Sequence, residues 1–232
     1  MKKVIYTVLF IFTMTSISAQ AQTSFDEDMT ALHGQIFKTC ALIKSKIGHD
    51  DSKTLKSLAE LKTQIAKLEN EYVKNPPKEY AKDPMFASYF YQLKDVVDIL
   101  SERVKRSDYK SATMNCSGFC KTFNKMHIIN GTLDLTDVMF MWYSQISMTN
   151  FMINAGNTKG ATMNVKKIPA IYRMVIDQKN KKNCDEFNKQ FESLDKTYQL
   201  WITAVKTNNF EEAKKQAKVF GAAFPMVFKN SL

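Results

Sequence analysis

Glycine and proline are scarce in this 232-residue chain, at 7 and 5 residues. Sheets need frequent turn residues between short strands, so this scarcity argues against an all-β fold and favours long helices. Histidine is scarce too, at 3 residues. No Ser/His/Asp arrangement, glycine-rich phosphate loop or H-E-x-x-H motif occurs. The sequence therefore offers no catalytic set, and we expect a protein that is not an enzyme.

Arginine is nearly absent, because the chain contains only Arg103, Arg106 and Arg173, although its formal net charge is +10. Specific reading of bases and phosphates relies on arginine. The lysines are spread along the chain rather than gathered in one run, which is typical of a solvated surface. The sequence therefore predicts no nucleic-acid partner. It leaves open a small ligand or another protein.

The chain has one long apolar run, and it lies at the N-terminus. Two lysines precede the apolar segment 4–14, and a small-x-small cleavage site (Ala-Gln-Ala) follows at 19–21. The run is shorter than the about 20 residues of a membrane-spanning helix. The pattern predicts a signal peptide at residues 1–21, a mature chain from Gln22 with no transmembrane segment, and a periplasmic or secreted location.

Apolar residues recur at steps of three and four through most of the remaining chain, which is the spacing of one helix face. Capping residues, glycines and prolines start and end these segments. The predicted helices span 26–47, 52–73, 84–104, 109–127, 135–154, a stretch after Lys159 interrupted at Pro169, 183–206, and a last helix capped by Asn208 or Asn209.

Short connections force neighbouring helices to run antiparallel. We therefore expect an all-α fold of two tandem antiparallel up-down-up-down four-helix bundles, at residues 22–129 and 131–232, with a turn at Asn130-Gly131 between them. A helical-repeat solenoid is the rival, because the turns at Asp108 and Asn209 resemble tetratricopeptide turns. However, no match recurs at the roughly 34-residue spacing of that repeat.

An internal repeat supports the two-bundle expectation. The segment 104–112 aligns with 205–213, and in the same register the phenylalanines at 119 and 123 fall on those at 220 and 224. A shorter match, Ala-Thr-Met-Asn at 112–115 and again at 161–164, is out of phase with this repeat. We interpret the shorter match as coincidental.

One copy of the repeat carries a cysteine pair that the other lacks. Cys116 aligns with Ala217, and Cys120 aligns with Gly221. Small residues therefore suffice at these positions. We expect the pair to contribute to function or oxidation state rather than to the fold.

Cys116, Cys120 and His127 lie at steps of four and seven, so a continuous helix places them on one stripe. Thiolates together with imidazole suit Cu(I) or Zn(II), which makes these three residues candidate metal ligands, with Cys40 as a fourth. Two alternatives stay open. The thiols can pack in the core as small apolar groups. In an oxidising compartment they can instead form a disulfide, most easily between helices from Cys40 to Cys116 or Cys120.

Three methionines, at 141, 148 and 152, share one face of the fifth predicted helix. Methionine thioethers can bind copper. A methionine stripe interleaved with Trp142, Ile146 and Phe151 is more typical of a packed core, and we interpret it so.

The stretch 115–125 (Asn-Cys-Ser-Gly-Phe-Cys-Lys-Thr-Phe-Asn-Lys), on the fourth helix after an Asp-Tyr turn, resembles the cytochrome c′ and cytochrome b562 superfamily. The resemblance implies an exported four-helix bundle with an electron-transfer or gas-binding ancestry. The c-type members of the superfamily attach haem through C-x-x-C-H. Here the spacing is C-x-x-x-C and Lys121 stands in the place of the haem-ligand histidine, so haem attached covalently is not expected. For the b-type arrangement, Met29 and His127 are the candidate haem ligands.

These observations predict an exported, non-enzymatic helical protein that binds a metal ion, a small apolar ligand or a protein partner. Cu(I) and Zn(II) are the candidate cofactors, and none is certain. The alternative is a redox protein, either a carrier of non-covalent haem or a thiol–disulfide protein that uses Cys116 and Cys120.

Overall fold

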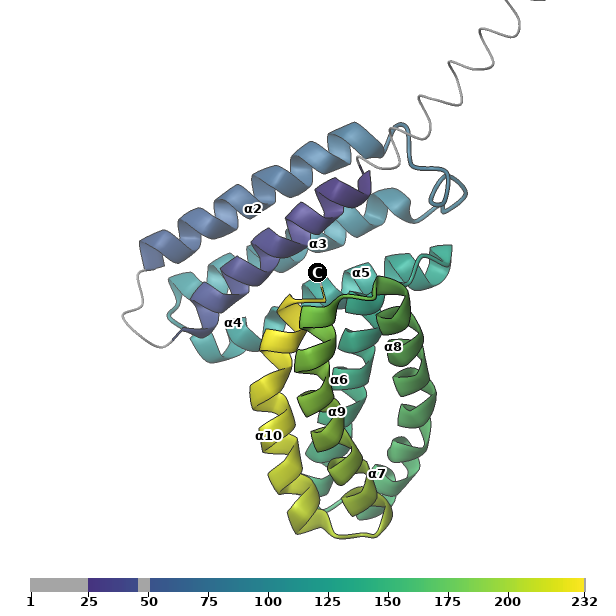
Figure 1. Cartoon of the computed structure of the whole chain (residues 1–232). Coiled ribbons are helices and arrows are strands. Elements are labelled where there is room, and N and C mark those ends of the chain that lie inside the picture. The colour runs from purple at the N-terminus through teal and green to yellow at the C-terminus, as the bar shows by residue number, and fades with distance from the viewer. Residues whose placement is uncertain (1–24, 46–50, 232) are drawn as a thin grey trace, which may run out of the picture. The chain divides into compact units, whose positions relative to one another are not determined.

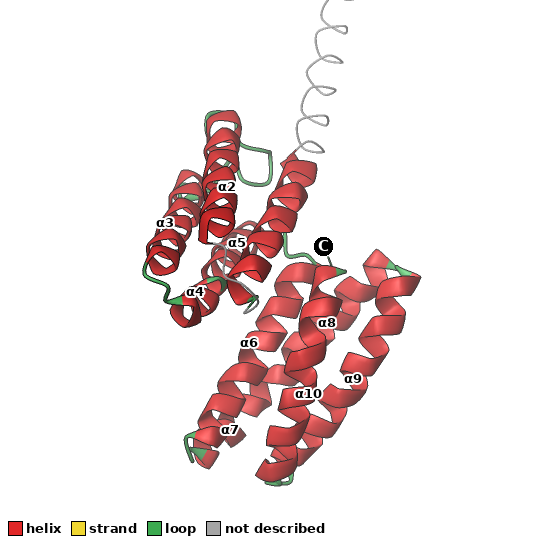
Figure 2. Cartoon of the chain, turned by 90° about the vertical axis from the view of Figure 1, so that its left-hand side faces the viewer, coloured by secondary structure: helices red, strands yellow, loops and turns green. Residues whose placement is uncertain are grey.

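The computed structural model describes residues 25–45 and 51–231, so the predicted signal peptide lies outside the described residues. Within those ranges the chain is helical and contains no strand (Figure 2), which confirms the predicted all-α class. The chain divides into two compact units, the first ending at Thr132 and the second beginning at Leu133 (Figure 1). None of the described helices is long and apolar enough to cross a membrane.

The first unit consists of a helix at residues 25–44, called the N-terminal helix below, and the helices α2 (Asp51–Tyr72), α3 (Phe86–Lys105), α4 (Tyr109–Asn115) and α5 (Ser117–Asn130). α3 packs against α2, α4 and α5. The apolar residues that recur along the predicted helix 52–73 are buried in α2 at Leu58, Leu61, Ile65, Leu68 and Tyr72, and Leu55 is half-buried.

Aromatic rings join the N-terminal helix to the core of the first unit. The ring of Phe25 lies 4.8 Å from that of Tyr72 and 6.0 Å from that of Phe86, measured between centroids. Further along the same helix, the ring of His33 lies 3.9 Å from that of Phe123 on α5. The N-terminal helix therefore contacts α2, α3 and α5 around one shared core.

The second unit consists of α6 (Leu135–Asn154), α7 (Thr158–Asn164), the short 3-10 helix η1 (Val165–Lys167), α8 (Ile168–Lys182), α9 (Asp185–Lys206) and α10 (Phe210–Lys229). α6 packs against α8 and α10, and α10 packs against α9. The predicted interruption of this stretch lies just before Pro169, at η1, and the proline itself lies in the first turn of α8, where its missing N–H is tolerated.

Trp142 of α6 is completely buried at the centre of the second unit. Its ring lies 5.5 Å from Tyr172 on α8, 4.9 Å from Tyr198 on α9 and 4.9 Å from Phe220 on α10. Burial raises the pKa of both tyrosines, so their hydroxyl groups stay protonated. One side chain thus contacts aromatic rings from all three of the other long helices.

One helix–turn–helix joint recurs three times within the described residues. Each joint has an N-cap side chain that accepts a hydrogen bond from the backbone N–H three residues later; the caps are Asp108, Asn157 and Asn209. A residue with positive φ precedes each cap; these residues are Ser107 (φ 55°), Gly156 (φ 74°) and Asn208 (φ 58°). The alanine four residues after each cap is completely buried; these are Ala112, Ala161 and Ala213.

This recurrence overturns our interpretation of the Ala-Thr-Met-Asn match as coincidental. The four residues end α4 in the first unit and α7 in the second, and both helices are seven residues long and follow a capped joint. The alignment of 104–112 with 205–213 pairs the first joint with the third. The shorter match pairs the first joint with the second, which is why it is out of phase.

Candidate functional site

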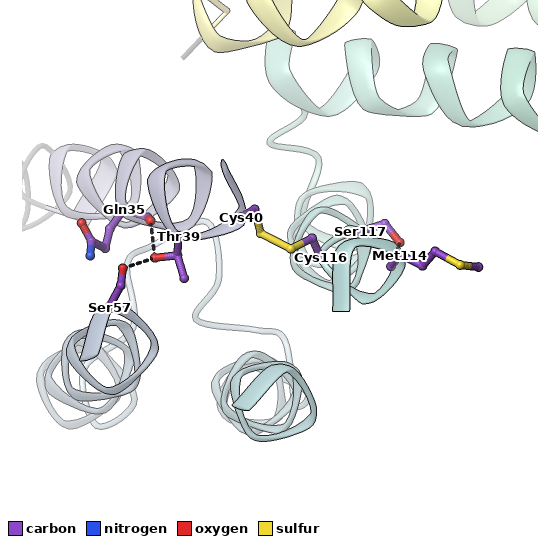
Figure 3. Close-up of a disulfide and its surroundings, with 7 residues drawn as sticks. All are labelled: Gln35, Thr39, Cys40, Ser57, Met114, Cys116 and Ser117. Carbon is purple, nitrogen blue, oxygen red and sulfur yellow. Dashed lines mark hydrogen bonds between the residues drawn. A yellow bond between two sulfur atoms is a disulfide. The ribbon is translucent and has the colours of Figure 1, made fainter. Parts of the chain in front are cut away.

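A disulfide joins the first and last parts of the first unit. It connects Cys40 of the N-terminal helix to Cys116, between α4 and α5 (Figure 3). The Cα atoms lie 6.0 Å apart, within the usual range for a disulfide. Both cysteines are half-buried. The bridge is one of the two inter-helix pairings that we predicted, and its partners are separated by 76 positions in the sequence.

Buried hydroxyl groups hold the N-terminal helix beside this disulfide. The Thr39 hydroxyl donates a hydrogen bond to the Gln35 carbonyl at 2.8 Å and lies 2.8 Å from the Ser57 hydroxyl on α2 (Figure 3). Because the single Thr39 proton points to Gln35, Ser57 is the donor to Thr39. The residue before Cys40 is thereby fixed to the neighbouring helix.

Cys116 lies where the chain changes from α4 to α5, rather than inside the single helix that we predicted over 109–127. The N–H of Phe119 bonds the Cys116 carbonyl at 3.3 Å, a three-residue step that tightens the helix here. The Ser117 hydroxyl donates to the Met114 carbonyl at 3.0 Å (Figure 3). The prediction of one regular helix face for the cysteine pair is therefore wrong.

Gly118 sets how closely α5 approaches α3. A Cβ atom at this position would lie 2.8 Å from Cγ2 of Val96, which is closer than real Cβ contacts. Valine is stiff about χ1 and cannot easily swing away. The glycine is therefore required sterically beside the disulfide.

The other predicted metal ligands lie further along α5. Cys120 is half-buried, and His127 is buried with its ring 6.3 Å from that of Phe123. The sulfur of Cys116 is bonded to Cys40 and does not carry the charge of a thiolate ligand. The Cu(I) or Zn(II) site at Cys116, Cys120 and His127 thus requires the reduced chain and stays a prediction. Met29, the other candidate haem ligand, is buried in the same core.

The second unit has an open groove of about 640 Å³ between α6 and α10. The residues that line it recur at steps of three and four on each helix, so each helix turns one face to the groove. They are Ser147, Asn150, Phe151 and Asn154 of α6, and Glu211, Lys214, Lys215, Ala217 and Lys218 of α10. The end of α6 faces the beginning of α10, so the two walls run antiparallel. Sequence reasoning did not identify this groove.

Phe151 is 68% exposed, and Met148 is 49% exposed. Our interpretation of the methionine stripe as core is therefore wrong at these two positions. The buried stripe of α6 runs through Trp142, Ile146 and Ile153, which leaves Phe151 on another face. The sequence spacing alone indicates that Phe151 lies on another face, because it is five residues from Ile146 and so lies off the buried stripe.

The side chain of Asn150 is held in place by Trp201 of α9, whose indole N–H donates a hydrogen bond to its side-chain oxygen at 2.9 Å. On the opposite wall, Lys214 pairs with Glu211 at 2.7 Å, and both side chains are reached by solvent. Such pairs contribute about 0–1 kcal/mol and open easily. Lys218 is exposed and makes no ion pair with the residues that the structure describes. The groove therefore combines an exposed aromatic ring with lysines that can bind an incoming anion.

No protein-family model, curated protein or solved structure matches this chain. The resemblance to the cytochrome c′ and cytochrome b562 superfamily rests on the stretch 115–125 alone.

Proposed function

We propose that this is an exported, non-enzymatic helical binding protein whose ligand occupies the groove between α6 and α10. The observation that carries the proposal is the exposure of Phe151 inside a groove lined by lysines. Contiguous exposed apolar patches with a polar rim are typical of interaction sites, and Met148, one turn before Phe151 on α6, is exposed as well. The volume of about 640 Å³ is within the range of ligand-binding clefts.

Of the three ligand classes expected from the sequence, a protein partner fits this groove best. Small-molecule sites bury most of their ligand, whereas this groove is open to solvent. Its lining holds one carboxylate, that of Glu211, and no cysteine or histidine, so it lacks a metal-ligand set. An elongated segment of another protein can cover both walls at once.

We also propose that each unit is an antiparallel four-helix bundle. The ring contacts of Trp142 with three other helices support this for the second unit. The contacts of the N-terminal helix with α2, α3 and α5 support it for the first. Expression of residues 22–132 and 133–232 as separate chains tests this, because each should show helical circular dichroism alone.

Occupation of the groove can be tested with 1-anilinonaphthalene-8-sulfonate, an anionic aromatic probe. We expect the probe to shift the amide resonances of 147–154 and 211–218, and Phe151→Ser to weaken its binding. Leu200→Ser, which changes an equally apolar exposed residue on α9, is the matched control and should have no effect. Shifts elsewhere, or equal binding by both variants, would contradict the proposal.

Thiol–disulfide exchange in the first unit is a second candidate function. The Cys40–Cys116 bridge is half-buried, and Cys120 follows Cys116 on the next turn. In exchange, an external thiolate attacks one sulfur, the S–S bond breaks and the other cysteine leaves as a thiolate. Equilibration with glutathione buffers tests this. A reduction potential below about −300 mV, with no effect of Cys120→Ser on the rate, would mark a purely structural disulfide.

A further inference from the structure

The walls of the groove between α6 and α10 have the surface pattern that a third helix fits. Lining residues recur at three- and four-residue steps on both walls, and helices pack by setting such ridges into grooves. The lined stretch of each wall is about two helical turns, or roughly 10–12 Å. An added strand would need a sheet edge, and the described residues contain no strand. A polyproline segment would need several aromatic walls, whereas Phe151 is the one aromatic residue among those described that line the groove.

The charges that line the groove favour a bound helix that carries negative charge. Lys214, Lys215 and Lys218 line it against the single carboxylate of Glu211. Lys214 and Lys218 are one turn apart on α10, about 6 Å, which matches two carboxylates at positions i and i+4 of a facing helix. The ion pairs that Lys214 and Lys215 make with Glu211 and Glu212 are exposed and weak, so they can exchange for new partners.

The groove also offers a place for one apolar side chain. Phe151 lies in one wall and is 68% exposed, and the small residue Ala217 lies in the other wall. In the first unit, the residue that aligns with Ala217 is Cys116, which is cross-linked to the first helix of its unit. The second unit has no such bond between its first and last helices, since its described cysteine, Cys184, lies at the beginning of α9.

We infer that the groove recognises an acidic amphipathic helix of a partner protein. The helix places an apolar side chain on Phe151 and carboxylates one turn apart on Lys214 and Lys218. This inference rests on the proposed function of the groove and adds the chemistry of its partner.

Two synthetic helical peptides test the inference. Both are alanine-based, carry one leucine and a fluorophore, and differ only in having glutamate or lysine at two positions four residues apart. Fluorescence anisotropy with the full mature chain should show the glutamate peptide binding at least about tenfold more tightly at low salt, with the preference falling as salt rises. Lys218→Glu should remove that preference. Lys196→Glu on α9 makes the same charge change at an exposed site outside the groove and is the matched control.

Each other outcome overturns a defined part of the argument. Equal binding of both peptides, insensitive to salt, would exclude an acidic partner and leave a groove for apolar helices. Equal weakening by Lys218→Glu and Lys196→Glu would show attraction by net charge rather than recognition in the groove. If neither peptide binds while the naphthalene probe still shifts the groove resonances, the acidic-helix inference fails and the proposed binding function stands. If the probe fails as well, both fail.

Discussion

The first and last helices of each unit meet, but they do so differently in the two units. In the first unit, Cys40 and Cys116 cross-link the N-terminal helix to the junction of α4 and α5. In the second unit, Ala217 aligns with Cys116, and the corresponding helices α6 and α10 leave an open groove between them. A covalent bond constrains the unfolded chain and so stabilises the fold. An open groove leaves the facing sides of both helices accessible to solvent. The first and last helices are thus joined by a covalent bond in one unit and lie beside an open groove in the other.

The cores of the two units also differ in the aromatic residues that fill them. Both tryptophans of the chain, Trp142 and Trp201, lie in the second unit and are completely buried. The first unit has no tryptophan and relies on aliphatic residues, phenylalanines and tyrosines, with the disulfide added. Large aromatic side chains contribute much buried area each. Tryptophan fluorescence therefore reports on the second unit alone, whereas far-ultraviolet circular dichroism reports on both.

The largest effect is expected from Trp142→Ala. Removing this central side chain leaves a cavity among four helices and should cost about 3–5 kcal/mol in the free energy of unfolding. In a urea titration, the unfolding transition followed by Trp201 fluorescence should move to a lower urea concentration. The circular dichroism transition of the first unit should keep its urea midpoint. Leu200→Ala, at an exposed site of α9, should stay within about 0.5 kcal/mol. A common shift of both signals would show that the units unfold together.

Removal of the disulfide should have the next largest effect, and in the other unit. The double variant Cys40→Ala, Cys116→Ala should lower the free energy of unfolding of the first unit by about 2–4 kcal/mol, because the bridge no longer limits the unfolded chain. The unit should still fold, since the aligned position in the second unit is Ala217. The tryptophan fluorescence transition should not move. Added reductant should destabilise the wild type and leave the variant unchanged; a variant that does not fold would refute the argument from the repeat.

Replacing one glycine on the last helix of each unit by alanine should change stability in opposite directions. Gly118→Ala puts a Cβ against Val96 and should cost about 1–3 kcal/mol, as overpacking does. Gly221→Ala on α10 meets nothing within 4 Å and should stabilise the second unit by about 0.5–1 kcal/mol, because alanine favours the helix. Urea midpoints from circular dichroism and fluorescence measure the two changes. Destabilisation by both substitutions would contradict a steric role specific to Gly118.

Much of the fold was predictable from the sequence because it depends on local signals. The helix class, the cap at Asn209 and the buried face of α9 all follow from spacing and capping residues, as Phe187, Leu194 and Trp201 show. The Cys40–Cys116 pairing was one of two inter-helix disulfides that the sequence left open, and the structure decides between them.

The groove was not predictable, because it depends on which faces of α6 and α10 are left uncovered. The spacing places Phe151 off the buried stripe of α6, but α6 is apolar around much of its circumference, so the sequence does not show which of its faces is left uncovered. The break at Cys116 was missed for a related reason. The break lies two residues before Gly118, whose close approach to Val96 involves another helix and cannot be read from local sequence.

The smallest effect is expected at the caps of the recurring joint, which are acidic in the first unit and neutral in the second. The hydrogen bonds that Asp108 accepts from Ser111, followed by the attraction of Arg103, lower the pKa of its carboxyl below the ordinary 3.8. A lowered pKa in the folded chain means that the stabilisation is complete above pH 3.8 and is lost as the pH falls through the folded value. Acid should therefore weaken the first unit of the wild type more than that of Asp108→Asn, as urea midpoints at pH 6 and pH 3 would show. The reciprocal change, Asn209→Asp, should give the second unit an acid sensitivity visible in tryptophan fluorescence. If the urea midpoints of wild type and Asp108→Asn fall in parallel as the pH is lowered, the cap contributes equally in both protonation states. The acidic and neutral caps would then be equivalent in their effect on stability.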